Sequence, residues 1–480
     1  MNVRGVARIL GLLLLTLAGA QLLPLVVTLS AGEEAATRGF AASALITAAL
    51  GLSLRVAGRR APEELFRRDG VLIVVAAWVL ASVTGALPYL LGGGIPGIVD
   101  ALFESTSGFT TTGASILVDI EAQGRGMLLW RSLTQWLGGI GIIVLFVALL
   151  SELGPGARFL FRMEVPGPNA EIMHPRVHES AVVLARFYVA LTAVMIAALL
   201  GAGASVYDAV THTFATVSTG GFSPYADSVA HFPVRIQLLI TLFMWIAGVN
   251  FSLYYLGLRD RTAAPFRDPE FRAFALLTAL AIAVVSGDLY SDGRAGGETL
   301  NDAVFGVVSV MTTTGFSNAD FSLWPSLSQA ILITLMVLGG CAGSTAGGAK
   351  IVRGMVGLRA VSREVRLVFH PTRVIAIPLG ATTLPNESVR AIVSFLVLFG
   401  LTWGAGAVLL TVHGTDLVTA ATASIATLSN VGPGLGQVGP AGNYAFFATW
   451  QKLLMIGLMW LGRLELFVGV ALLQRSFWRH

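Results

Sequence analysis

Four glycine-centred tracts recur along the chain, each at the same distance from an Asp-Ala or Thr-Ala pair. The tracts lie thirteen residues after Asp100, Asp208, Asp302 and Thr419, and their glycines are Gly113, Gly221, Gly315 and Gly432. Chance can produce one such match in a Gly-rich hydrophobic sequence, but four copies at one spacing indicate a repeated unit. Glycine adopts the positive φ angles that let successive carbonyls point the same way. Because carbonyl oxygens that face one axis can replace the hydration shell of a cation, the repeat predicts an ion filter.

The residues expected to hold the ion lie at these glycines and just before them. They are Thr111, Thr112, Gly113, Gly220, Gly221, Thr313, Thr314, Gly315, Asn430, Val431 and Gly432. Their backbone carbonyls are the expected ligands, so the filter requires no carboxylate.

Short helices must position these tracts. The segments that lead into the glycines, such as residues 102–109 and 304–311, are too short to cross a bilayer, which takes about 20 residues. We therefore expect half-membrane helices that enter from outside and turn back, with the Asp or Thr capping free amides in the first turn. A surface Asp in an ordinary loop would explain any single copy, but not the shared register. Non-helical backbone at membrane depth requires protein or a water-filled path beside it, which implies a central aqueous axis.

The composition indicates that lipid surrounds most of the chain. Of 480 residues, 55% are hydrophobic and 12% are charged, against about 25% charged in soluble domains. Ten apolar runs are long enough to be membrane spans: residues 9–30, 39–56, 71–92, 127–150, 180–203, 234–257, 271–290, 326–349, 388–411 and 450–472. The first run follows Arg4 and Arg8 like a secretory signal, but it is too long for one, and we expect it to remain as a span.

The arginines predict the orientation. If both termini are cytoplasmic, most of the 31 Lys and Arg residues fall on the cytoplasmic side, as the positive-inside rule requires. The basic excess therefore needs no nucleic-acid partner. The single cysteine, Cys341, excludes an internal disulfide, and no catalytic set is visible, so we expect no enzymatic activity.

At the four tracts the sequence resembles the Trk/Ktr/HKT superfamily of potassium and sodium transporters, specifically its bacterial TrkH type. The signatures are Thr-Thr-Gly-Ala, Gly-Gly-Phe-Ser, Thr-Thr-Thr-Gly-Phe and Ser-Asn-Val-Gly-Pro-Gly, which are specific in combination. The resemblance implies an all-α polytopic membrane protein with four span–re-entrant loop–span units in a pseudo-fourfold arrangement around one pore, plus two N-terminal transmembrane helices. The expected divisions are 1–69 for the two helices, 70–150, 151–257, 258–373 with a gating loop, and 374–480.

The same resemblance implies the ion and the location. In this family glycine in all four tracts goes with potassium, whereas serine in the first goes with sodium. We therefore expect potassium uptake across the bacterial inner membrane, passive or by symport with another ion, with K⁺ as the transported ion and no organic cofactor in this chain. The alternatives are a sodium-permeable or poorly selective transporter of the same fold, or a non-conducting membrane scaffold.

A Gly-rich run and one arginine are the candidate gate. Residues 339–350 contain too many glycines for a stable helix and resemble the family's intramembrane loop, although a small-residue packing face is the alternative. Arg463 lies within the last span, where a charge is costly, and the family places it in the pore; a structural ion pair is the alternative. The expected gate residues are Gly343, Ser344, Thr345, Gly347, Gly348, Lys350 and Arg463.

The resemblance also implies partners. We expect a homodimer docked on a cytoplasmic ring of nucleotide-binding TrkA-type regulatory subunits, through loops 55–69, 151–179 and 350–387. His212, Asn250 and Lys452 are weaker candidates for a functional role, because isolated polar groups near spans more often make interhelical hydrogen bonds.

Overall fold

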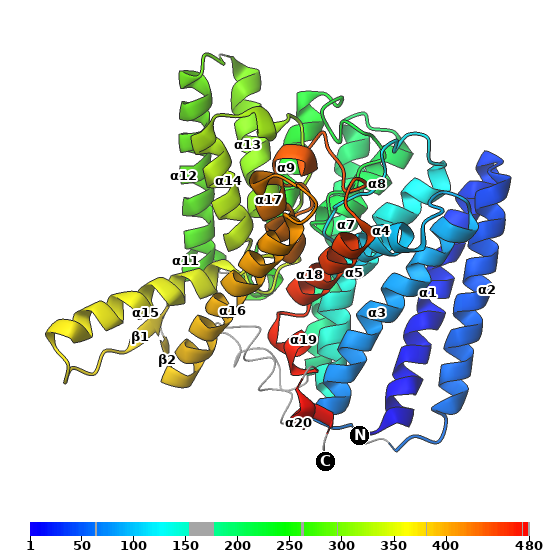
Figure 1. Cartoon of the computed structure of the whole chain (residues 1–480), viewed down its shortest axis with the longest axis horizontal. Coiled ribbons are helices and arrows are strands. Elements are labelled where there is room, and N and C mark those ends of the chain that lie inside the picture. Colours follow the sequence, from blue (N-terminus) through cyan, green and yellow to red (C-terminus); the bar gives the residue numbers. More distant parts are fainter. Residues whose placement is uncertain are drawn as a thin grey trace.

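The computed structural model is almost wholly helical and surrounds the four predicted tracts with long apolar helices (Figure 1). It describes residues 1–62, 65–152, 177–260, 264–294, 296–380, 382–472 and 474–478; within these ranges, side chains are not described for 67, 142–152, 177–181, 258–260, 264, 382 and 476. The exceptions to the all-α prediction are two short antiparallel strands, β1 (Ile377–Leu379) and β2 (Thr382–Leu384), which pair Ile377 with Leu384.

Six helices of the described part are long and apolar enough to cross a membrane without a break. They are α1 (Val3–Ala31), α2 (Glu34–Ala57), α3 (Arg67–Leu91), α7 (Val177–Gly201), α12 (Pro269–Ser291) and α16 (Asn386–Leu410). The predicted span 127–150 lies in α5 (Arg125–Glu152), most of whose second half has no described side chains.

The remaining three predicted spans are interrupted; a break in the eighth was expected from its glycines, and the breaks in the sixth and the tenth were not. The first breaks between α9 (Val234–Ala247) and α10 (Phe251–Asp260), which are bent by 89°. The second ends with α14 (Ser326–Leu338) because Gly339 takes a positive φ, and the chain becomes helical again only at α15 (Ile351–Phe369). The third ends with α18 (Thr449–Arg463), where Glu465 and Leu466 adopt positive φ angles before the short α19 (Phe467–Ala471).

Four short helices lie between the long ones, in the upper half of Figure 1. They are α4 (Ile98–Phe109), α8 (Val206–Val217), α13 (Gly297–Met311) and α17 (Leu417–Leu428). Each is preceded by a longer helix and followed by another apolar helix, which gives four units of the order α3–α4–α5, α7–α8–α9, α12–α13–α14 and α16–α17–α18. We call these units 1 to 4.

The first-turn prediction holds for three of the four helices, α4, α8 and α17, and fails for α13. Asp100 and Asp208 lie in the first turns of α4 and α8. Asp302 does not, because α13 begins five residues earlier at Gly297 and has Glu298 in its first turn. Thr419 is the third residue of α17, whose N-cap is Asp416.

Buried apolar side chains join the units pairwise. One cluster contains residues of units 1 and 4, a second joins units 3 and 4, and a third joins units 2 and 3. The helices α1 and α2 pack on α3 and α5 at one side, while α15 projects from the opposite side with β1 and β2 beneath it (Figure 1). The other short elements are α11 (Ala264–Arg267), α20 (Arg475–Trp478), and the 3₁₀ turns η3 (Phe321–Leu323) and η4 (Gly436–Val438).

Candidate ion filter and gate

The four short helices end in the same turn. A left-handed residue follows each helix at Thr111, Thr219, Thr313 and Asn430, with φ of 52°, 54°, 54° and 54°. Two residues later the glycine of each tract has a φ of 81°, 76°, 84° and 95° at Gly113, Gly221, Gly315 and Gly432. The prediction omitted Thr219, although its register two residues before Gly221 is the same as that of Thr111 and Thr313.

One hydrogen bond closes each of these turns. The residue before the filter glycine donates its N–H to a carbonyl five residues back, in the pairs Thr112–Ser107 (2.8 Å), Gly220–Ala215 (2.7 Å), Thr314–Ser309 (2.9 Å) and Val431–Ala426 (2.8 Å). This is the pattern of a Schellman helix end, which is usually built with glycine at the left-handed position. Threonine at that position is strained, and such strain persists only where the surroundings enforce it.

The four glycines bring the tracts into a closed ring. A Cβ atom on Gly113 would lie 2.3 Å from the carbonyl oxygen of Gly220 in unit 2, and one on Gly221 would lie 2.0 Å from that of Thr314 in unit 3. A Cβ atom on Gly315 would lie 2.0 Å from the carbonyl oxygen of Val431 in unit 4, and one on Gly432 would lie 2.5 Å from that of Thr112 in unit 1. Each tract therefore meets the next at the same point, and the fourth returns to the first. The predicted filter residues are brought together, with Thr219 added.

Two side chains outside the predicted set hold the ring in place. Gln135 on α5 donates to the Gly220 carbonyl (2.6 Å) and accepts from the N–H of Phe222 (3.0 Å). Tyr444 donates its hydroxyl to the Gly432 carbonyl (2.7 Å). A carbonyl oxygen has two lone pairs, so these contacts leave a second one at each oxygen. The spacing of the glycines carries no signal for Gln135 or Tyr444, because they lie elsewhere in the chain.

The fourth tract is also joined to the first through a side chain. Asn430 donates through Nδ2 to the hydroxyl of Thr112 (2.9 Å) and to the carbonyl of Met459 on α18 (3.1 Å). Asn430 is buried, and its contact crosses from unit 4 to unit 1. Thr112 itself pairs with Thr110 through their hydroxyls, and Thr314 pairs with Thr312 in the same way, at 2.7 Å in both cases.

The Gly-rich run is an unwound loop that lies against the ends of the short helices. Residues 339–350 contain no helix. The N–H of Gly347 donates to the Thr313 hydroxyl (2.6 Å), and the N–H of Gly348 donates to the Ser429 carbonyl (3.0 Å). Thr345 donates its hydroxyl to the Val217 carbonyl (3.2 Å). These contacts exclude the helical packing face that was the alternative interpretation of this run.

Further contacts fasten the rest of the loop. The Gly343 carbonyl accepts from the N–H of Phe251 (3.1 Å) beside Asn250, at the break between α9 and α10. Ser344 donates to the Cys341 carbonyl (2.6 Å), and Lys350 bonds back to the Ala346 carbonyl.

The carboxylate of Glu270 joins the two ends of the loop. It accepts from the backbone N–H groups of Ala342 (2.8 Å) and Val352 (3.2 Å), which lie on either side of Gly343, Gly347 and Gly348. Glu270 is buried at the start of α12. The sequence prediction did not include it, because nothing local to Glu270 shows which backbone it contacts.

Arg463 touches this loop and has no acidic partner in the part of the chain that the structure describes. It is the last residue of α18 and is 7% exposed. Its Nη1 donates to the Thr345 carbonyl (2.9 Å), while Nε and Nη2 are buried and have no hydrogen-bond partner among described residues. Glu465 instead pairs with Arg353 on α15. The geometry favours the interpretation of Arg463 as a charge beside the loop over a structural ion pair.

Two of the weaker candidates, Lys452 and His212, make structural contacts. Lys452 pairs with Asp100 at 2.6 Å, which joins α18 to the start of α4. His212 lies in α8 with Nδ1 at 2.9 Å from the Asp208 carbonyl and Nε2 at 3.2 Å from the Ser223 hydroxyl.

Two polar groups at the N-terminal ends of the short helices have shifted pKa values. Tyr225 donates its hydroxyl to Asp208 (2.8 Å), and partial burial together with this bond raises the pKa of Tyr225 to about 12. Hydrogen bonds from Thr419 lower the pKa of the exposed Asp416 carboxyl, whose Oδ1 accepts from the Thr419 N–H at 2.9 Å. At neutral pH Asp416 is therefore charged, as suits a carboxylate at a helix N-terminus.

Comparison with known proteins gives similarities over the whole chain. A family model described as TrkH, a cation transport protein, matches residues 35–476. The Trk system potassium uptake protein TrkH of Salmonella typhimurium is 38% identical over 486 residues, and that of Escherichia coli K12 is 37% identical over 489, with 100% of each chain covered. The crystal structure of the potassium transporter TrkH from Vibrio parahaemolyticus has a TM-score of 0.90 at 34% identity and also covers 100% of both chains.

Proposed function

The chain belongs to the TrkH family of cation transport proteins, and on that basis we propose that it carries potassium ions through the ring of Gly113, Gly221, Gly315 and Gly432. The family is one of multi-pass membrane transporters and is not an enzyme family. The observation that carries the proposal is the closed ring, in which each glycine lies against a carbonyl oxygen of the next tract. The relatives' names supply the ion, since they are potassium uptake proteins.

The ring has the features that a dehydrated cation requires. Backbone carbonyls replace water around the ion, and the C-terminal ends of the four short helices add partial negative charge of about half an elementary charge each. All four ring positions are glycine, so no side chain fills the axis or separates the tracts. Potassium passes, in this proposal, either down its own gradient or coupled to a second ion.

The proposed gating follows from the position of the loop, which lies against the C-terminal ends of the short helices. Residues 339–350 are bonded to Thr313 and Ser429, so in this conformation the loop closes the path just past the filter. The positive charge of Arg463 beside Thr345 adds an electrostatic barrier to a cation. Opening then requires the loop to leave Thr313, Ser429 and Arg463.

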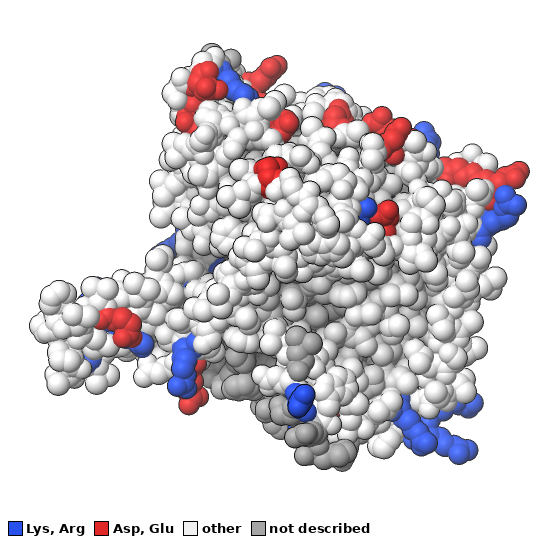
Figure 2. Space-filling model, viewed as in Figure 1, with Lys and Arg blue, Asp and Glu red and all other residues white. Residues whose placement is uncertain are grey.

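The charge distribution supports the proposed orientation in a bacterial inner membrane. Acidic side chains gather at the end where the short helices begin, and basic side chains gather at the opposite end beneath α1 and α2 (Figure 2). At this end, Arg4 and Arg8 lie near the start of α1, and Arg55 lies in the last turn of α2, which is followed by Arg59 and Arg60. With this end in the cytoplasm, the filter opens to the outside and the loop faces inward.

The projecting helix α15 supports a homodimer. Leu358, Val361, Val365 and Val368 are spaced so that they share one face, and all four are exposed, Leu358 and Val368 by 74% and 77%. A second copy of the chain is the proposed cover for this face. A cytoplasmic ring of TrkA-type nucleotide-binding subunits would then contact residues 55–69 and 350–387; most of the third predicted docking loop, 151–179, lies outside the described residues.

The double variant Leu358→Glu/Val365→Glu is expected to convert the detergent-solubilised dimer into a monomer, because it places two carboxylates on an apolar contact face. Light scattering coupled to gel filtration measures the mass. Arg366→Glu, an exposed change on another side of α15, is the matched control and should remain dimeric. A dimer that survives the double variant would show that α15 is not the contact.

Complementation separates a transporter from a scaffold. A bacterial strain that lacks potassium uptake should grow in low potassium when it expresses this chain with a TrkA-type subunit. Failure to grow despite normal membrane levels of the protein would contradict the proposed function.

A further inference from the structure

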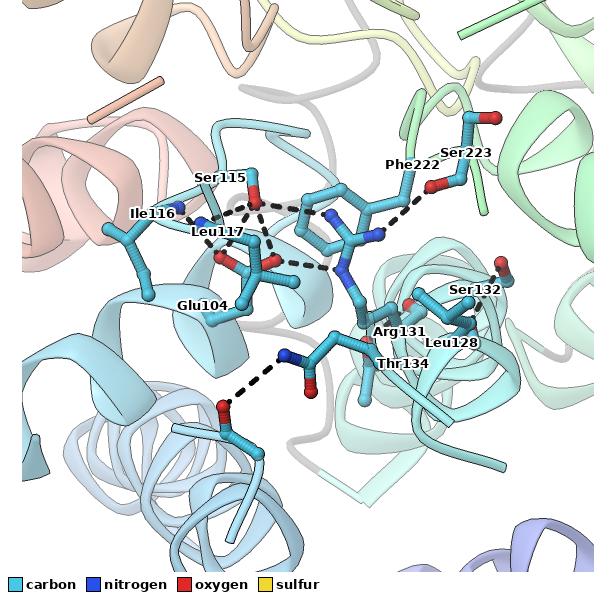
Figure 3. A network of polar contacts seen from close by, with 12 residues as sticks. Glu104, Ser115, Ile116, Leu117, Leu128, Arg131, Ser132, Thr134, Phe222 and Ser223 are labelled. Atoms are coloured by element: carbon cyan, nitrogen blue, oxygen red, sulfur yellow. Dashed lines mark hydrogen bonds and ion pairs between the residues drawn. The ribbon is translucent and has the colours of Figure 1, made fainter. Parts of the chain in front are cut away.

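A buried ion pair lies beside the filter, between units 1 and 2. Glu104 on α4 and Arg131 on α5 are 0% and 1% exposed, and Arg131 Nε lies 2.8 Å from Glu104 Oε1 (Figure 3). Burying two charges costs free energy that is recovered only when the remaining donors and acceptors are also satisfied. Here the remaining atoms bond to the residues that follow the filter glycines.

The pair joins equivalent positions of two neighbouring tracts. Ser115 and Ser223 each lie two residues after a filter glycine. Arg131 donates through Nη2 to the Ser115 hydroxyl (3.2 Å) and through Nη1 to the Ser223 carbonyl (2.9 Å). The guanidinium also lies over the ring of Phe222, 4.1 Å from its centre. One rigid, planar group therefore spans the junction between the first and second tracts.

Glu104 fixes the first tract from the other side. Its carboxylate accepts from the Ser115 hydroxyl at 3.0 and 3.1 Å and from the backbone N–H of Ile116 at 3.0 Å. The carbonyl of Ser115 accepts from the N–H of Tyr444, whose hydroxyl bonds to Gly432. Ser115 is thus the point where units 1, 2 and 4 meet.

The repeat shows that this charge pair is particular to unit 1. Glu104 lies four residues after Asp100, and the matching positions in units 2, 3 and 4 are His212, Gly306 and Ala423. The corresponding short helices of units 2, 3 and 4 fold without a carboxylate at this position. The cost of a buried charge in one unit alone points to a role in the filter itself.

We propose that Glu104 and Arg131 are positioning residues for ion selectivity, which set the separation of the first and second tracts without contacting the ion. The inference rests on the proposed potassium function. A ring of carbonyls distinguishes K⁺ from Na⁺ by its size or by the number of oxygens it presents, and both depend on the spacing of the tracts. If Glu104 and Arg131 no longer hold the first and second tracts in place, a shift of a fraction of an ångström between the tracts is expected to weaken that distinction.

The decisive variant is Arg131→Lys, because lysine keeps the charge and lacks the planar fork that reaches both tracts. We expect its K⁺ over Na⁺ permeability ratio, measured from reversal potentials of the purified protein in planar bilayers, to fall by about tenfold relative to wild type. Arg294→Gln, an exposed arginine that pairs with Asp292 away from the filter, is the control and should keep the wild-type ratio.

Two further variants separate positioning from charge balance and from misfolding. The double variant Glu104→Gln/Arg131→Gln is neutral, and we expect its ratio to stay low; a return to the wild-type ratio would overturn the positioning role. Ser115→Ala removes one hydroxyl and keeps the ion pair, so it tests the junction between the first and second tracts if the other variants do not reach the membrane. Its K⁺ over Na⁺ permeability ratio is expected to fall about threefold.

The outcomes distinguish this inference from the proposed function. A wild-type protein that does not prefer K⁺ contradicts the proposed function. A selective wild type whose Arg131→Lys and Ser115→Ala variants keep the full ratio overturns the inference and leaves the proposed function intact.

Discussion

Replacing Gly315 with alanine is expected to reduce potassium uptake by about 100-fold or more, because the ring has no room for a methyl group. The added Cβ would lie 2.0 Å from the Val431 carbonyl oxygen and 2.8 Å from Pro433 Cδ. Gly315 also has a φ of 84°, which a residue with a side chain adopts only under strain. Both effects separate unit 3 from unit 4 at the level of the ion.

The control for this substitution lies in the same unit. A Cβ on Gly287, in the C-terminal part of α12, would meet no atom within 4 Å. Gly287→Ala should therefore leave uptake unchanged, since alanine is preferred to glycine inside a helix. Rubidium uptake into proteoliposomes measures both variants, and full activity of folded Gly315→Ala would contradict the ring.

Replacing Arg463 with alanine is expected to raise flux by about tenfold, because it removes a positive charge from the path of a cation. Nε and Nη2 of Arg463 have no hydrogen-bond partners among described residues, so the folded protein loses little beyond the bond to Thr345. That bond also holds the loop, and its loss favours the open state.

Arg463→Lys provides the matched control. Lysine retains the charge, so flux through this variant should stay close to that of the wild type. Tracer flux into proteoliposomes without the regulatory subunit is the measurement, since it isolates the gate built into this chain. Unchanged flux through a correctly folded Arg463→Ala protein would remove Arg463 from the gate.

The thirteen-residue register allowed the four filter turns to be predicted because a repeat is a property of the sequence itself. Thr111, Thr313 and Asn430 were found this way, and Thr219 was available from the same register. The unwound loop could also be predicted, since glycine at this density disfavours a helix in any surroundings. Local chemistry was sufficient for these features.

Other features depend on contacts between distant parts of the chain and could not be predicted. Arg131 lies near the start of the predicted span 127–150, and only the fold shows that it is buried against Glu104 and the second tract. Gln135 and Glu270 bond to backbone groups 85 and 72 residues away. Hydropathy likewise gave ten spans because an apolar run has the same composition whether its helix is continuous or broken.

The most direct test of a potassium-selective ring is the reversal potential of the wild-type protein in a planar bilayer, with KCl on one side and NaCl at the same concentration on the other. The ring predicts a potential close to the value for a membrane permeable to K⁺ alone, with Rb⁺ able to replace K⁺. A reversal potential near zero, which means equal permeability to K⁺ and Na⁺, would contradict it.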